Sequence, residues 1–166
     1  MIDQYHHVNH AALALSETVA MSDAIEAALK LIDYRETLFL VTADHSHGFT
    51  MNGYPPRGHP ILGQAGVSNI DGRPYTTLMY NTGPSKSERH RVPLEAVEAD
   101  DYQQVRNVPI KYAVHGGEDV ALYAMGPMAH LVRGVLEQHV VGHIIHYAAC
   151  LGDGTELRSR CDERKP

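Results

Sequence analysis

The 166-residue chain has no tryptophan, two phenylalanines and two cysteines. No stretch of about 18 consecutive uncharged apolar residues is present, the length that a bilayer-spanning helix requires. Its 14 Lys and Arg residues are outnumbered by 20 Asp and Glu residues, which gives a formal net charge of −6. There is therefore no excess of positive charge to neutralise a nucleic-acid backbone or an anionic membrane, and neither partner is predicted.

Histidine is the residue type in excess, with 12 residues. It is the commonest metal ligand and the side chain that titrates near neutral pH, so the excess points toward metal chemistry. At this length and with 43% hydrophobic residues, the chain is predicted to form one soluble globular domain.

The N-terminal third predicts a helix followed by a strand. Apolar residues recur with helical spacing from Val8 to Ile32, without glycine or proline, which predicts a long amphipathic helix. The short apolar run Thr37–Thr42 predicts a strand buried on both faces of an α/β sheet. Residues 1–20 have polar side chains where a signal peptide would have its basic and apolar regions.

Proline and glycine divide residues 53–113 into short pieces, of which only Thr76–Tyr80 reads as a strand. This composition predicts an inserted, loop-rich subdomain. Regular structure is expected to resume with a strand at Asp119–Met125 and a histidine-rich helix from Ala129 to Cys150.

Three places combine side chains that can bind a metal. The first is Asp3 and His7, an i, i+4 pair whose side chains can converge near the start of the long helix, where they could hold one zinc ion. The alternative is a helix-capping Asp3 with a surface His7.

The second place is Asp44 and His45, which follow the predicted buried strand at its carboxyl end, where open α/β sheets bind ligands. A carboxylate oxygen and an imidazole nitrogen suit zinc. His47 lies two positions further on and could support the ligands or contact a substrate. The alternative is a polar turn after the strand.

The third place is His115, in a glycine-rich turn before the strand at Asp119–Met125. Catalytic zinc usually takes three protein ligands and leaves one position open, and Asp3, His7 and His115 would make that set. Asp44 and His45 would then be two ligands of a second, incomplete site.

These residues stand in motifs that resemble the eukaryotic-type alkaline phosphatases. The motifs, in chain order, are Ile2-Asp3-x-x-His6-His7, Val41-Thr42-Ala43-Asp44-His45-Ser46-His47, Gly53-Tyr54-x-Pro56-Arg57-Gly58 and His115-Gly116-Gly117-Glu118-Asp119-Val120. The stretches Gly126-Pro127-Met128-Ala129-His130 and Ala148-Ala149-Cys150 fit as well. The resemblance covers nearly the whole chain.

The resemblance implies the C-terminal portion of an alkaline-phosphatase-like α/β/α sandwich with an inserted crown subdomain. The implied segments are a core part at 1–52, the crown at 53–113, a return to the core at 114–151 and a tail at 152–166. The crown would form a homodimer interface, with Tyr54 reaching toward the partner's active site.

The resemblance also implies two zinc ions and one magnesium ion. Asp3, His7 and His115 would hold the zinc that stabilises the leaving alkoxide, and Asp44 and His45 would hold the zinc that activates the nucleophile. Spacing alone leaves Cys150 and Cys161 either as a small disulfide loop or as unpaired thiols, and the resemblance favours the disulfide.

The implied activity is hydrolysis of phosphate monoesters through a phosphoseryl intermediate, at an extracellular or cell-surface location. The Asp-Ser-Ala nucleophile motif and most magnesium ligands have no counterpart in the sequence, and no tail typical of a lipid anchor follows Cys161. We therefore expect a fragment that is inactive alone. The alternative is a non-catalytic zinc-binding or dimerisation module derived from such an enzyme; another hydrolase or mutase of the superfamily is disfavoured by the crown-like segment.

Overall fold

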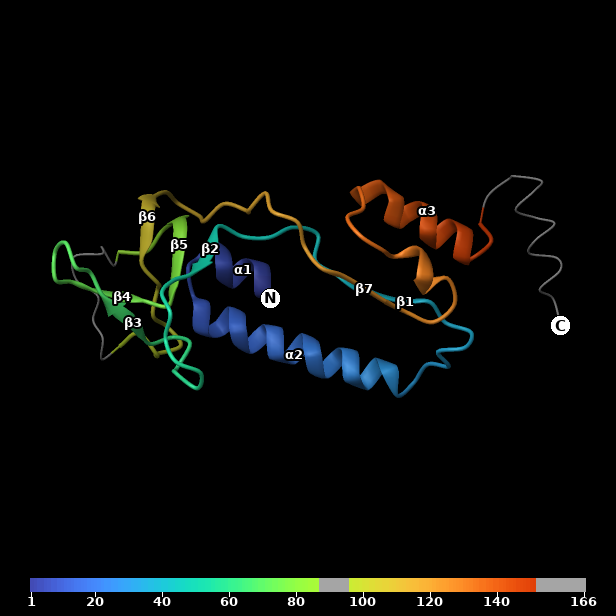
Figure 1. The fold of residues 1–166 in the computed structure, drawn as a ribbon, viewed down its shortest axis with the longest axis horizontal. Helices are drawn as coiled ribbons and strands as arrows, with labels where there is room; N and C mark the ends of the chain where they lie inside the picture. Colours follow the sequence, from blue (N-terminus) through green and yellow to red (C-terminus); the bar gives the residue numbers. More distant parts are fainter. Residues whose placement is uncertain (87–95, 152–166) are drawn as a thin grey trace. The chain divides into compact units, whose positions relative to one another are not determined.

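A computed structural model describes residues 1–86 and 96–151 (Figure 1). The described chain is a mixed α/β protein, as predicted. Two compact units divide it: Met1–Ala27 with Asp44–Val120, and Ala28–Ala43 with the chain from Ala121 onward. In chain order the elements are α1 Ile2–His7, α2 Ala11–Leu29, β1 Phe39–Thr42, β2 Phe49–Met51, β3 Gln64–Val67, β4 Pro74–Thr76, β5 Leu78–Gly83, β6 Arg106–Pro109, β7 Leu122–Met125, the 3-10 helix η2 Ala129–Leu131, and α3 Gln138–Ala148.

The N-terminal helix begins later than predicted, because Asn9 separates α1 from α2. Asn9 is fully buried and has a φ of 60°, in the left-handed region that asparagine adopts more readily than most residues. Its side-chain amide donates to the carbonyl of Thr82 at 3.3 Å, and its own carbonyl accepts from the backbone N–H of Gln104 at 2.8 Å. These contacts fix the break, so α1 is a separate helix.

The first unit contains a three-stranded sheet in the order β2-β5-β6 and a β3-β4 hairpin. β5 pairs antiparallel with β2, with Tyr80 opposite Phe49, and parallel with β6, with Tyr80 opposite Arg106. The prediction of one strand within residues 53–113 was therefore wrong. Pro74 begins β4 and Pro109 ends β6, so these prolines occupy strand ends, where a missing N–H donor is tolerated.

The core of the first unit lies where α2 meets β5. It contains the buried residues Ala11, Leu78, Tyr80 and Ala113, against which Leu15, Phe49 and Leu62 pack. This core joins the start of α2, the middle of β5 and the segment after β6, and it therefore supports α1, which precedes α2 directly.

The second unit contains the antiparallel pair β1 and β7, in which Phe39 lies opposite Met125 and Thr42 opposite Leu122. Both strands were predicted. The prediction that β1 is buried on both faces was wrong. Its first three residues are half-buried, and Thr42 is exposed. A sheet that has two strands among the described residues cannot enclose either strand.

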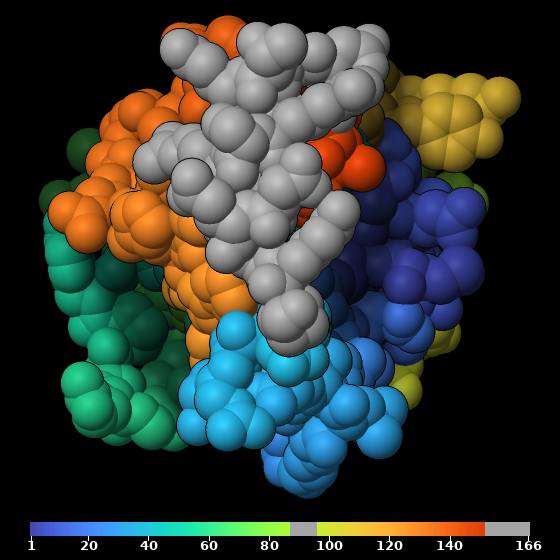
Figure 2. All heavy atoms as spheres, turned by 90° about the vertical axis from the view of Figure 1, so that its right-hand side faces the viewer, coloured from blue at the N-terminus to red at the C-terminus, as the bar shows by residue number. Residues whose placement is uncertain are grey.

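The predicted helix from Ala129 to Cys150 is divided into η2 and α3. Gly134, with a φ of 66°, lies between them. In the second unit the connection between α2 and β1 lies at the surface (light blue in Figure 2), where Leu31 and Tyr34 are 87% and 63% exposed. Among the described residues, no helix is both long enough and apolar enough to cross a membrane.

Candidate metal centre

The candidate site takes its side chains from three segments of the first unit. Asp3 and His7 lie one turn apart on α1, His47 lies just before β2, and His115 lies between β6 and β7. An antiparallel β-bridge pairs His47 with His115, so their two segments lie side by side. Residues distant in sequence are thereby brought next to α1.

Gly116 permits the close approach of these two segments. Its N–H donates to the carbonyl of Ser46 at 2.9 Å, and on the other side of the bridge Gly48 donates to Val114 at 3.1 Å. A Cβ atom at position 116 would overlap the side chains of Ser46 and Glu118, which hydrogen-bond to each other. A residue larger than glycine would therefore displace these two side chains and disturb their hydrogen bond.

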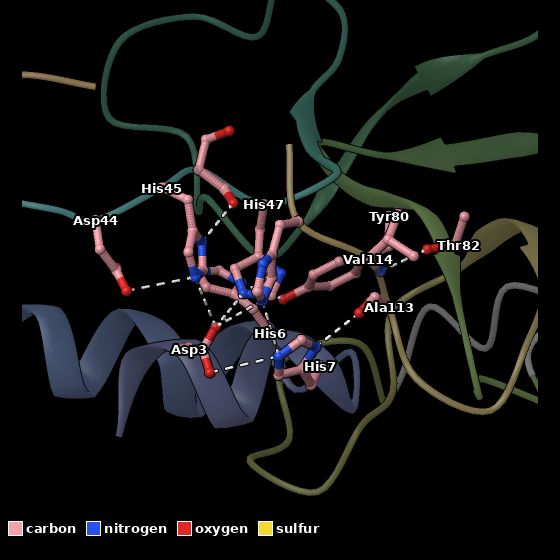
Figure 3. Close-up of polar contacts among 12 residues, drawn as sticks. Asp3, His6, His7, Asp44, His45, His47, Tyr80, Thr82, Ala113 and Val114 are labelled. Atoms are coloured by element: carbon pink, nitrogen blue, oxygen red, sulfur yellow. Dashed lines mark hydrogen bonds and ion pairs between the residues drawn. The ribbon is translucent and has the colours of Figure 1, made fainter. Parts of the chain in front are cut away.

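One donor atom from each of Asp3, His7, His47 and His115 lies within 4.8 Å of the others, and Figure 3 shows the first three converging. Asp3 Oδ2 is 3.4 Å from His7 Nε2, Asp3 Oδ1 is 3.5 Å from His115 Nε2, and the two Nε2 atoms are 3.1 Å apart. Around a tetrahedral zinc with ligand distances of about 2.0–2.2 Å, neighbouring donor atoms lie about 3.3–3.6 Å apart. The two distances from Asp3 match this spacing, although each runs to a different carboxylate oxygen, and the distance between the two Nε2 atoms is slightly shorter. The three side chains are therefore close enough to share one metal ion.

The tautomer of His7 suits a metal ligand. Its Nδ1 lies 2.6 Å from the backbone carbonyl of Ala113. Because a carbonyl only accepts, Nδ1 carries a proton and donates to it, and Nε2 is the ring nitrogen that faces the cluster. This arrangement, in which one ring nitrogen donates to the protein while the other faces the site, is typical of metal-binding histidines.

His47 has the opposite arrangement. Its Nε2 lies 2.7 Å from Asp3 Oδ1, its Nδ1 is buried without a hydrogen-bond partner, and its side chain is 6% exposed. Burial lowers the pKa of His47, although the nearby Asp3 carboxylate acts in the other direction. A neutral His47 that donates from Nε2 to Asp3 satisfies both observations, so the geometry favours a role in orienting the carboxylate.

The charge of Asp3 is stabilised by its surroundings. Partial burial alone would raise the pKa of this carboxyl group, but the hydrogen bond from His47 and the nearby imidazoles of His7 and His115 outweigh it. The net effect places the pKa of Asp3 below its ordinary value. Asp3 is therefore ionised at neutral pH, as a metal ligand must be.

Asp44 and His45 lie beside these residues. His45 Nδ1 is 3.0 Å from the carbonyl of Ser46, to which it donates, and its Nε2 lies 3.6 Å from Asp44 Oδ2 and 3.8 Å from Asp3 Oδ1. The His45 ring also stacks on His115 with centroids 3.5 Å apart. The Asp44 side chain is 82% exposed. Together they offer one oxygen and one nitrogen donor for a second ion.

Two residues at this site were not singled out from the sequence. His6 Nδ1 lies 2.7 Å from the hydroxyl oxygen of Tyr80. Burial, followed by repulsion from His47, lowers the pKa of His6 to about 4, so its ring is neutral at neutral pH. His6 belongs to a family motif, but its contact with β5 has no local signal in the sequence.

Two other predictions are not tested by the structure. Tyr54 lies between β2 and β3 and is fully exposed, and its predicted reach toward a partner's active site stays a prediction. Cys161 lies outside the described residues, and its pairing with Cys150 stays a prediction.

Comparisons with known proteins agree with these motifs. The family model for alkaline phosphatase matches residues 1–151. The tissue-nonspecific alkaline phosphatase isozymes of Rattus norvegicus and Homo sapiens are 45% and 46% identical over 156 residues, which is 91% of this chain. The chain spans 30% of the length of each of these relatives. With the family model matching nearly all of its residues, the chain belongs to the alkaline phosphatase family.

Proposed function

We propose that this chain supplies the zinc-binding part of a phosphatase that hydrolyses phosphate monoesters. The observation that carries the proposal is the convergence of Asp3, His7 and His115 at distances suited to one zinc ion. The name of the matched family supports the reaction class.

In this proposal Asp3, His7 and His115 hold one zinc, and Asp44 and His45 contribute to a second. Zinc supplies a Lewis acid for phosphate oxygens and lowers the pKa of a bound water to about 7. The Ala113 and Ser46 carbonyls accept from the Nδ1 atoms of His7 and His45, so the Nε2 atoms are the ones that would bind the ions. Magnesium is proposed from the family alone.

Ser46 is unsuited to be the nucleophile although it lies between His45 and His47. Its hydroxyl proton is already donated to the carboxylate of Glu118. We therefore propose that the 166-residue chain binds zinc but does not turn over phosphate esters by itself.

The first experiment titrates the metal-free chain with zinc in competition with a chromogenic chelator and assays a chromogenic phosphate ester at alkaline pH. We expect tight zinc binding that His115→Ala weakens by at least about 100-fold, and no turnover. Absence of zinc binding by the folded chain would contradict the proposed metal site, and zinc-dependent turnover would contradict the inactivity.

A second experiment separates the enzymatic role from a non-catalytic zinc-binding or dimerisation module. The 156 matched residues would replace the corresponding segment of the Rattus norvegicus isozyme. Turnover by this chimera, lost in His115→Ala, would support the enzymatic role. A folded chimera that binds zinc without turnover would favour the module.

The remaining family-based features are part of the same proposal. Residues 53–113 would form a crown-like dimer surface with Tyr54 exposed on it, within an α/β/α sandwich with the segment boundaries given above. An extracellular or cell-surface location and the Cys150–Cys161 disulfide complete the proposal. Sedimentation measurements on the chain, with and without Tyr54→Ala, would test the dimer.

A further inference from the structure

We infer that Tyr80 is a positioning residue for the zinc site, whose hydroxyl holds His6 and thereby fixes the helix that carries Asp3 and His7. The inference rests on the proposed zinc site. It concerns a contact between residues 74 positions apart in sequence, joining α1 to the middle of β5.

Tyr80 is a rigid anchor point. It is completely buried and belongs to the core with Ala11 and Ala113. Its backbone N–H donates to the carbonyl of Val105 at 2.9 Å, and β5 is the central strand of its sheet. Its position is therefore set by the sheet and the core, independently of any metal.

The hydroxyl of Tyr80 leaves this core toward His6 (Figure 3). It lies 2.7 Å from His6 Nδ1, and no other acceptor lies within hydrogen-bonding distance of it among the described residues. Burial raises the pKa of Tyr80, so the hydroxyl keeps its proton. Tyr80 therefore donates to His6 Nδ1, and His6 carries its own proton on Nε2.

The two adjacent histidines are thus held in opposite tautomers. In a neutral ring the Ala113 carbonyl holds the proton of His7 on Nδ1, which makes Nε2 the nitrogen that can bind a cation, whereas the Tyr80 hydroxyl leaves His6 Nε2 protonated. A protonated ring nitrogen cannot bind a cation. The hydrogen bond from Tyr80 therefore also distinguishes which of the two neighbouring imidazoles is available to zinc.

His6 links β5 to the site, because its ring contacts side chains of both. Its ring centroid lies 4.8 Å from that of Phe49, 5.7 Å from that of Tyr80 and 5.0 Å from that of His47, the residue that donates to Asp3. Helix α1 has six residues, too few to be stable without tertiary contacts. Loss of the Tyr80 hydroxyl should therefore leave Asp3 and His7 less well placed for a common ion.

The test compares Tyr80→Phe with the matched control Tyr75→Phe, which removes a hydroxyl from β4 in the neighbouring hairpin. Zinc affinity is measured by chelator competition, the metal-free fold by circular dichroism, and ligand geometry by the absorption spectrum of bound Co²⁺. We expect Tyr80→Phe to weaken zinc binding about 10- to 100-fold and to change the Co²⁺ spectrum. Tyr75→Phe should change zinc affinity by less than about twofold.

A second pair of variants tests the hydrogen bond without altering the core. The side-chain oxygen of asparagine can replace a histidine Nδ1 as acceptor, so His6→Asn should retain most of the zinc affinity, whereas His6→Leu should lose it as Tyr80→Phe does. Folded Tyr80→Phe with unchanged zinc affinity and Co²⁺ spectrum would overturn the inference. If Tyr80→Phe does not fold, equal affinities of His6→Asn and His6→Leu would overturn it. Failure of the wild-type chain to bind zinc would instead contradict the proposed function.

Discussion

The histidines of the two units differ in their surroundings. In the first unit His7, His47 and His115 converge on the Asp3 carboxylate, and the tautomers of His7 and His47 follow from their hydrogen bonds. In the second unit three histidines lie on α3 with the spacing i, i+4, i+7, and all are exposed. They are His139, His143 and His146.

This difference shows what a metal site requires beyond imidazoles. His139 and His143 are neighbours, with ring centroids 5.9 Å apart. Among the described residues, however, the group of three or more close donors is the one around Asp3. Exposed rings must give up rotamer freedom before they bind, whereas His7 and His47 are already held. The histidines of the first unit therefore differ from those of α3 in two ways: their rings are held in place before a metal binds, and they surround a carboxylate.

The largest effect should come from removing the central carboxylate. Asp3→Asn keeps the size of the side chain but removes the charge on which three imidazoles converge, and we expect zinc affinity to fall by about 1000-fold or more. Chelator competition measures it, with His143→Ala as the matched control from the exposed group. Similar losses in the two variants would contradict the distinction between the two regions.

Part of the site could be predicted from the sequence. Asp3 and His7 are one helical turn apart, and His115 was added because catalytic zinc usually takes three protein ligands. The structure brings the three together, while their role as ligands stays a prediction. The hydrogen bond between His47 and Asp3 and that between His6 and Tyr80 join residues 44 and 74 positions apart. Such contacts depend on the tertiary fold and cannot be predicted from the spacing of residues along the sequence.

The fold was predictable where one local signal dominated. The mixed α/β class and the strands β1 and β7 were predicted correctly. The strands between residues 53 and 113 were mostly missed, because proline and glycine were read as breaking regular structure although they lie at strand ends and at a β-bulge. The break at Asn9 was missed because it depends on buried contacts with Thr82 and Gln104.

The next largest effect concerns the pH dependence of the metal-free protein. Burial lowers the pKa of His6 to about 4 in the folded state, from 6.5. Between these values the unfolded chain binds more protons, so the free energy of unfolding should decrease as pH falls, by on the order of 3 kcal/mol in total. Urea unfolding at about pH 7 and about pH 4.5 measures the decrease. His6→Asn should reduce it, and an unchanged slope would show that His6 is not the neutral buried group described here.

A smaller effect is expected from His47→Ala. In the proposed site this residue orients Asp3 without binding the ion, so its loss should weaken zinc binding about 10-fold, much less than Asp3→Asn. His47→Gln, which keeps an N–H donor in the side chain, should recover part of the affinity. If His47→Ala lowers zinc affinity as much as His7→Ala does, His47 is itself a ligand. The zinc ion would then have four protein ligands, His47 in addition to Asp3, His7 and His115.

The smallest effect should come from the exposed histidines of α3. The double variant His139→Ala and His143→Ala removes an i, i+4 pair that can chelate a cation only after two exposed side chains are ordered, and its rings are 5.9 Å apart without a fixed tautomer. Calorimetric titration with zinc should therefore show the tight site unchanged within about twofold, with at most a weak later phase removed. A loss of the tight phase would mean that zinc binds preferentially to the exposed pair. The convergence around Asp3 would then be a hydrogen-bonded cluster without a bound ion.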